Sequence, residues 1–234
     1  MKNLFSIRRC AYVAFAMMLT IMTTVFFTAC GESDKNTKAE TNDSKVSDTA
    51  DKDSSSNPKK NDTKILVAYF SHTGENYQVG VIEKGNTHIV ADMIAEATGA
   101  DEFEIKTINP YPDTYKECTD VAKQELAENA RPELSTKIDD INKYDTIFLG
   151  YPIWWSDMPM AVYTFMESYD FNGKTIIPFC TSAGDYMTGK EVNIPTFAKG
   201  ATLRDGIGIV GKRCQDDPES VKKDVNAWLK SIGF

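Results

Sequence analysis

Lys64-Ile-Leu-Val-Ala-Tyr-Phe70 is the stretch of sequence that decides the fold, and it leads directly into Ser71-His72-Thr73-Gly74. The apolar run has the length of a β-strand and shows no polar alternation. This pattern predicts a strand that is buried on both faces, as in a parallel sheet with helices on either side. The hydroxyl residues and the glycine that follow predict a turn at the carboxyl end of this strand.

Downstream of this strand, the chain alternates between segments of strand length and segments with helical spacing. Further strands are predicted at 102–105, 146–150, 174–179 and 201–209. Helices are predicted at 87–98, 112–129, 159–168, 192–198 and 218–232. Because helices separate the strands, hairpins are excluded and the sheet must be parallel. The sequence therefore predicts one α/β domain over residues 64–234, with a doubly wound five-stranded parallel sheet.

Residues 1–29 have the pattern of a secretory signal and are not expected to belong to the fold. A cationic start is followed by 18 apolar and small residues, from Cys10 to Phe27, and by small residues before Cys30. This ending resembles the bacterial lipoprotein signal, which implies that Cys30 is lipidated and becomes the new N-terminus. The alternative is an uncleaved transmembrane anchor, since the apolar run is near the lower length limit for spanning. Both alternatives predict an exported domain that is held at the extracytoplasmic face of a membrane.

Residues 30–63 are predicted to form a disordered tether between the signal and the domain. This segment is rich in Ser, Thr, Asn, Asp and Lys, has no periodicity and cannot bury apolar surface. A flexible chain of this length has an average reach of roughly 30 Å. Such a tether would lift the domain off the membrane without releasing it.

The predicted domain is acidic, with 26 acidic and 17 basic residues over 64–234. A nucleic-acid partner is excluded on this ground, because such proteins need a basic surface to meet phosphates. Three cysteines remain in the domain, namely Cys118, Cys180 and Cys214. They show neither C-x-x-C nor Cys/His spacing, so no metal site and no redox dithiol are expected. Their redox state is left open.

Unusual residues follow three of the five predicted strands. In doubly wound sheets, ligands bind beyond the carboxyl ends of the strands. Residues 71–76 follow the first strand, 151–157 the third and 181–186 the fourth, whereas the other two loops are plain. The sequence therefore predicts a binding site that is built from these three loops.

The first of these loops has the donors of a phosphate site. Ser71, Thr73 and Gly74 offer hydroxyls and closely approaching backbone amides, and the start of the next helix adds a partial positive charge. Asn86 or Thr87 is expected to cap that helix. The Gly-Lys-Ser/Thr of a nucleoside-triphosphate loop is missing, so the neutral donors favour the phosphate monoester of a bound cofactor. A Ser/Thr-rich turn without a ligand is the alternative.

The second loop contains Pro152-Ile153-Trp154-Trp155. Two consecutive tryptophans on an exposed turn indicate a flat aromatic ligand, and the alternative is that one or both indoles pack into the core. The third loop, Thr181 to Gly184, offers small residues and backbone donors for the polar edge of such a ligand. Taken alone, this third loop would be an ordinary turn.

These motifs together resemble the flavodoxin family. The resemblance is carried by Tyr69–Gly74, Gly85–Thr87, Gly150–Trp155 and Thr181–Gly184, and it extends over 64–234. It implies a flavodoxin-like sheet with the strand order 2-1-3-4-5 and FMN as the cofactor. The FMN-binding residues that it implies are Ser71, His72, Thr73, Gly74, Asn86 and Thr87 at the phosphate end and Pro152, Ile153, Trp154, Trp155, Thr181, Ser182, Ala183 and Gly184 around the ring.

The sequence departs from the family pattern at two places. Residues 75–85 are inserted between the glycine of the first motif and the Asn-Thr pair, so Asn76 could contact the phosphate in place of Asn86. Tyr77 in this insertion could shield the ring. The pair Trp154-Trp155 stands where the family has one stacking aromatic, which leaves open the indole that faces the ring.

The glycine-rich segment from Gly206 to Gly211 matches the dinucleotide pattern G-x-G-x-x-G. It falls within the last predicted strand, and no helix is expected over 212–219. The required strand–turn–helix context is therefore missing, and no dinucleotide site is expected there.

The sequence as a whole predicts an FMN-binding redox protein that carries electrons at the outer face of a bacterial membrane. Its partner would be a redox protein or a small electron acceptor. Two alternatives stay open: an NAD(P)H-dependent FMN oxidoreductase similar to quinone reductases, and a flavin-free module that recognises an extracellular partner.

Overall fold

The computed structural model describes residues 64–184 and 186–234. The predicted signal, the tether and the lipidation site Cys30 lie outside the described residues. In the described part of the chain, no helix has the length and hydropathy that crossing a bilayer requires.

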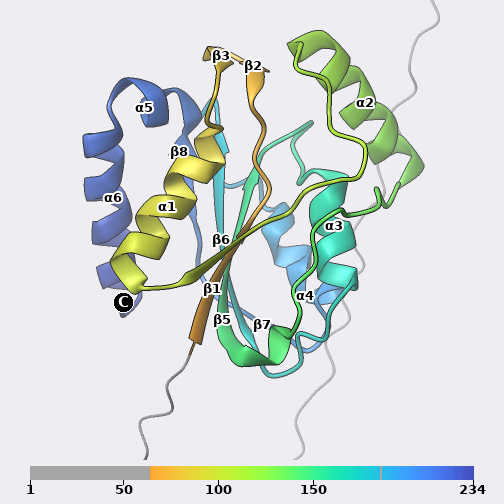
Figure 1. The fold of residues 1–234 in the computed structure, drawn as a ribbon. Coiled ribbons are helices and arrows are strands. Elements are labelled where there is room, and N and C mark those ends of the chain that lie inside the picture. Colours follow the sequence, from red (N-terminus) through yellow and green to blue (C-terminus); the bar gives the residue numbers. More distant parts are fainter. Residues whose placement is uncertain (1–63, 185) are drawn as a thin grey trace, which may run out of the picture. The chain divides into compact units, whose positions relative to one another are not determined.

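A parallel sheet forms the centre of the domain (Figure 1). Its strands are β1 (Lys64–Tyr69), β4 (Asp101–Glu104), β5 (Tyr144–Pro152), β6 (Thr175–Ser182), β7 (Thr202–Leu203) and β8 (Ile207–Val210). They run in the order β4-β1-β5-β6, and both β7 and β8 pair in parallel with β6. This arrangement confirms the predicted fold class and strand order.

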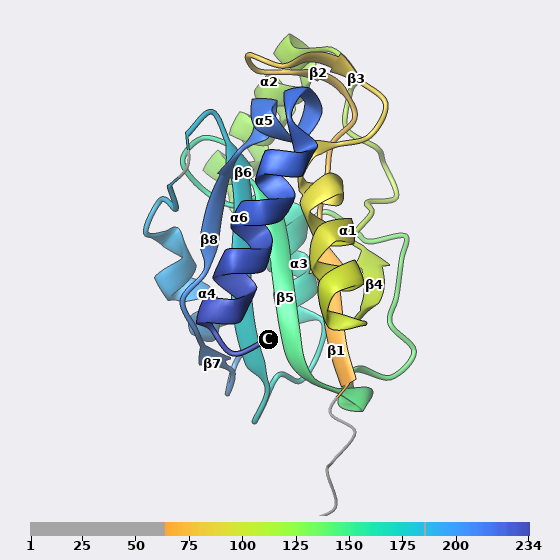
Figure 2. The same cartoon turned by 90° about the vertical axis from the view of Figure 1, so that its left-hand side faces the viewer.

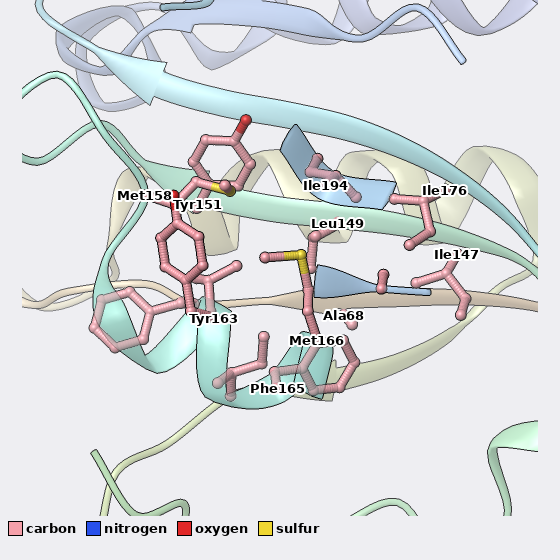
Figure 3. Packing of buried hydrophobic residues seen from close by; sticks show 14 of the residues in the cluster. Ala68, Ile147, Leu149, Tyr151, Met158, Tyr163, Phe165, Met166, Ile176 and Ile194 are labelled. Carbon is pink, nitrogen blue, oxygen red and sulfur yellow. The ribbon is translucent and has the colours of Figure 1, made fainter. Parts of the chain in front are cut away.

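Helices cover both faces of the sheet (Figures 1 and 2). On one face lie α1 (Asn86–Thr98), α5 (Gly211–Asp216) and α6 (Pro218–Ser231), and on the other α2 (Tyr115–Glu128), α3 (Met160–Glu167) and α4 (Ile194–Phe197). Short 3₁₀ turns at Ile141–Lys143 and Lys190–Asn193 precede β5 and α4. The apolar run of β1 explains this layering, because its alternate residues enter two separate cores. Leu66 and Ala68 pack with α3 and α4 (the core of Figure 3), whereas Val67 and Tyr69 pack with α1 and α6.

The predicted fifth strand, 201–209, forms two short strands. Lys174 and Ile176 direct their carbonyls toward β7, where they accept from the backbone N–H groups of Thr202 and Arg204. Two residues further along β6, Pro178 has no N–H to offer on the same side. The pairing is therefore interrupted at this proline, and it resumes between Phe179 and Ile207.

The sequence analysis did not predict one hairpin and one helix of the structure. The segment that interrupts the first motif forms an antiparallel hairpin of β2 (Gly74–Asn76) and β3 (Gly80–Ile82). Helix α5 begins directly after β8, so the expectation that no helix follows the G-x-G-x-x-G motif was wrong. In the described part of the chain, no strand follows to complete a βαβ unit. Close packing explains why this motif contains glycine, since a Cβ at Gly208 would lie 2.7 Å from the Tyr186 backbone.

Candidate functional site

The loops after β1, β5 and β6 meet around a pocket of about 280 Å³. This pocket lies at the carboxyl ends of the three central strands, where the sequence places it. The β2–β3 hairpin and the first half of α2 complete its wall. Ten of the fourteen predicted residues line it, namely His72, Asn86, Thr87, Pro152, Ile153, Trp154, Trp155, Thr181, Ser182 and Ala183.

The other four predicted residues, Ser71, Thr73, Gly74 and Gly184, lie in the same loops but do not line the pocket. Gly74 approaches the backbone of Asp113, since a Cβ there would lie 2.6 Å from the Asp113 carbonyl oxygen. Gly184 closes a tight turn in which its N–H donates to Ser182 Oγ at 3.0 Å. Thr73 is exposed.

One end of the pocket is polar. Asn86 and Thr87 begin helix α1 and are buried. The Thr87 hydroxyl lies 2.8 Å from the hydroxyl of Thr181, which is also buried. This hydrogen bond joins the start of α1 to the end of β6, so the helix start and the third loop are held together at their polar residues.

The start of α1 differs from the expectation that Asn86 or Thr87 caps it. The N-cap residue is Gly85, which makes no side-chain cap, and Asn86 is the first helical residue. Ser71 supplies the cap from the neighbouring loop, because its Oγ accepts from the backbone N–H of His88 at 3.1 Å. Gly85 is required by this contact, since a Cβ there would lie 2.1 Å from Ser71 Oγ. The cap prediction was wrong because the capping side chain, Ser71, comes from the distant loop after β1 and not from the residues next to the helix.

The two tryptophans have different environments. Trp154 is partly buried among aromatic side chains, with edge-on contacts to Phe70 and Tyr111 at 5.3 and 5.0 Å between ring centroids. Trp155 is 50% exposed, and its indole N–H donates to the Thr119 carbonyl of α2 at 2.9 Å. One indole therefore belongs to the core and the other to the surface, and both line the pocket.

A strained turn presents Trp155. Trp154 and Asp157 exchange both backbone hydrogen bonds at 2.9 Å, which closes a two-residue turn over Trp155 and Ser156. Both central residues have positive φ, 52° and 62°, values that side-chain-bearing residues adopt at a cost of about 1–2 kcal/mol each. Asn-Gly is the usual sequence for such a turn. The strain is tolerated because Trp154 is held by the core and Trp155 is held by α2.

The β2–β3 hairpin is fastened to the start of α2. The Glu75 N–H donates to the Asp113 carbonyl at 2.7 Å, and Glu75 Oε2 accepts from the Tyr115 N–H at 2.9 Å. Tyr77 stacks on Tyr115 with 5.7 Å between ring centroids. Asn76 uses its side-chain amide to bond the carbonyls of Gly74 and His72, so it braces the loop.

The pocket lining carries little charge. Glu75 is the only carboxylate, and there is no lysine or arginine, among the described residues that line it. Burial lowers the pKa of His72, whose Nε2–H donates to the Pro112 carbonyl at 3.0 Å, so this imidazole is neutral at pH 7. Burial raises the pKa of Cys118, at the α2 side of the pocket, to about 12. This thiol therefore stays protonated, and it is not a nucleophile.

Sequence reasoning missed several lining residues. Tyr115, Cys118, Thr119 and Ala122 come from α2, and Tyr186 and Gly211 come from the segments on either side of β7 and β8. The α2 residues carried no signal, because their chemistry is ordinary and long-range contacts with the hairpin and with Trp155 bring them to the pocket. Gly211 belonged to the glycine motif that was set aside.

A doubly wound parallel sheet with a pocket at the carboxyl ends of its central strands defines a class of α/β proteins that bind their ligands at this edge of the sheet. A model of the flavodoxin family matches residues 64–231, and the chain therefore belongs to this family. Its membership supports FMN as the cofactor.

Solved structures support the assignment to this family. A flavoprotein from Bacteroides uniformis is 31% identical at a TM-score of 0.58, with 72% of this chain and 98% of that chain covered. A flavoprotein from Bacteroides eggerthii is 28% identical at a TM-score of 0.55, with 74% and 99% covered. A flavoprotein from Lactobacillus acidophilus, solved in complex with FMN, shares the fold at 21% identity and a TM-score of 0.50, with 68% and 99% covered. No curated protein matches the chain.

The residues present fit FMN. The polar end offers the Asn86 amide, hydroxyls and the first N–H groups of α1, which together suit a phosphate without a lysine or arginine. Trp154, Trp155, Tyr77 and Tyr115 offer apolar aromatic surface to a ring. When bound, FMN supplies one- and two-electron redox chemistry. The protein's part is to hold both ends of the cofactor, to limit water at the ring and to set the local charge through Glu75.

We expect Ser156→Gly to stabilise the folded protein by about 1 kcal/mol, because glycine adopts positive φ without the steric cost. The free energy of unfolding in urea measures this effect. Ser156→Ala keeps the strain and removes the same hydroxyl, so it should not increase stability. Equal stabilities for the two variants would show that the turn is not strained.

Proposed function

We propose that this protein binds FMN in the pocket and carries electrons at the outer face of a bacterial membrane. The observation that supports FMN binding best is the division of the pocket into a polar end, where Thr87 bonds Thr181, and an aromatic end, where Trp155 is exposed. This division matches a molecule with a phosphate at one end and a flat ring at the other.

The charge of the domain favours a low reduction potential. Reduced flavin is anionic, and residues 64–234 carry a net charge of −9. Glu75 places one of these charges at the pocket itself, and no lysine or arginine among the described lining residues offsets it. Electrostatic repulsion therefore disfavours the reduced form, and for one electron about 59 mV corresponds to each tenfold change in the equilibrium. A low-potential flavin suits a donor of electrons.

The purified protein should take up FMN stoichiometrically and show flavin absorption bands in the near-ultraviolet and the blue, which dithionite bleaches.

The midpoint potential of the bound flavin should be negative and lower than that of free FMN. The Glu75→Gln variant should raise this potential by some tens of millivolts at low salt, with less effect at high salt. Redox titration measures both. Gln can still accept the Tyr115 hydrogen bond. A positive potential would contradict the electrostatic argument, and a protein that takes up no FMN would favour a flavin-free binding module.

A second candidate function is an NAD(P)H-dependent FMN oxidoreductase, and the rim of the pocket favours it. Tyr77, Tyr115, Trp155 and Tyr186 all line the pocket while keeping 57%, 39%, 50% and 62% of their surface exposed. Apart from Phe234, these are the exposed large aromatic side chains of the described residues. Such a rim offers stacking surface to a second planar molecule.

Steady-state oxidation of NADH and NADPH by the FMN-loaded protein separates the two functions. For the electron carrier we expect turnover close to that of free FMN, with or without an added quinone. Saturable turnover that Tyr77→Ala weakens, and that Phe234→Ala leaves unchanged, would instead establish the oxidoreductase.

The proposed location depends on Cys30. We expect Cys30→Ala to abolish incorporation of labelled fatty acid and to leave the precursor unprocessed, because lipidation requires the thiol. Cys10→Ala removes the other cysteine of the N-terminal segment and should change neither readout. Fatty-acid labelling and fractionation of cells that express the full chain measure both outcomes. Normal labelling of the Cys30→Ala protein would contradict the proposed anchor.

A further inference from the structure

Gln215 connects helix α5 to the polar end of the pocket, although no motif pointed to it. Its side-chain Nε2 donates to Asn86 Oδ1 at 2.9 Å and to the backbone carbonyl of Lys84 at 2.9 Å. Asn86 is buried and lines the pocket. The contact joins residues that are 129 positions apart in the chain.

These two bonds fix the orientation of both amides. A backbone carbonyl can only accept, so the Gln215 group that meets Lys84 must be the NH₂. The same NH₂ meets Asn86, whose facing atom must therefore be the oxygen. The Asn86 NH₂ is left on the opposite side. This NH₂ lies beside Gly211, which also lines the pocket. A Cβ at Gly211 would lie 2.8 Å from Asn86 Nδ2.

The orientation has a chemical consequence. The hydrogen bonds of the described residues give Asn86 Oδ1 a donor but give Nδ2 no acceptor. A carboxamide held in this way presents two N–H donors and no acceptor. Such a group suits an anionic oxygen, and at the first residue of α1 it adds to the partial positive charge of the helix start.

We propose that Gln215 is a positioning residue that holds the Asn86 amide with its NH₂ toward the phosphate of FMN, and that this contact distinguishes FMN from riboflavin. The proposal rests on the proposed FMN binding. Gln215→Glu tests this role most directly. A carboxylate at position 215 can only accept, so it would bind the Asn86 NH₂ and reverse the orientation of the Asn86 amide. The Asn86 oxygen would then face the phosphate.

The test is a titration of the flavin-free full chain with FMN and with riboflavin. Quenching of the flavin fluorescence measures the binding of each. Gln215→Glu should weaken FMN binding by about 10- to 100-fold, as expected for losing a hydrogen bond to a charged group, and should leave riboflavin binding unchanged. Gln124→Glu introduces the same charge at an exposed position of α2 and serves as the matched control. It should bind both flavins like the parent protein.

The Asn86→Ala background separates positioning from simple charge repulsion. If Gln215 acts through Asn86, then Gln215→Glu causes no further loss of FMN affinity in this background. A similar loss in both backgrounds, or an equal change for FMN and riboflavin, would overturn the proposal. Failure of the parent protein to bind FMN would instead overturn the proposed function, and circular dichroism of each variant excludes misfolding as the cause.

Discussion

The pairing of β5 with β1 on one side and β6 on the other is the constraint on which the rest of the structure depends. Helices cover both faces of these strands, so their interior positions accept only apolar side chains. Ile147, Phe148 and Leu149 are fully buried on consecutive positions. Polar side chains are therefore excluded from the middle of these strands, and they lie at the carboxyl ends of the three strands.

The hydrogen bonds at that end have a structural as well as a binding role. Thr87 with Thr181, and Asn86 with Gln215, join α1 to β6 and to α5, elements that are far apart in the sequence. The polar end of the pocket is thus held by its own residues, and the cofactor would not need to order it. The aromatic end is built differently, because the β2–β3 hairpin and α2 support Tyr77 and Trp155 from outside the sheet.

The sequence was sufficient for the sheet and for ten of the twenty residues that line the pocket, because both follow from local patterns. The apolar run of β1 requires burial on both faces, and the residues after it must then lie at the carboxyl edge. The parts that were missed depend on distant contacts. Ser71 caps a helix that begins fifteen residues later, and Pro178 interrupts a strand that lies some thirty residues away. No local pattern carries such information, and the same is true of Gln215.

The interruption at Pro178 also shortens the strands at one border of the sheet. Exposed strand edges can recruit an edge of another chain and lead to aggregation. Here the outer border is divided into β7, with two residues, and β8, with four. The opposite border, β4, has only four residues, and Asp101, Glu102 and Glu104 place like charges along it. Both borders therefore resist edge-to-edge self-association, even where many copies are crowded together.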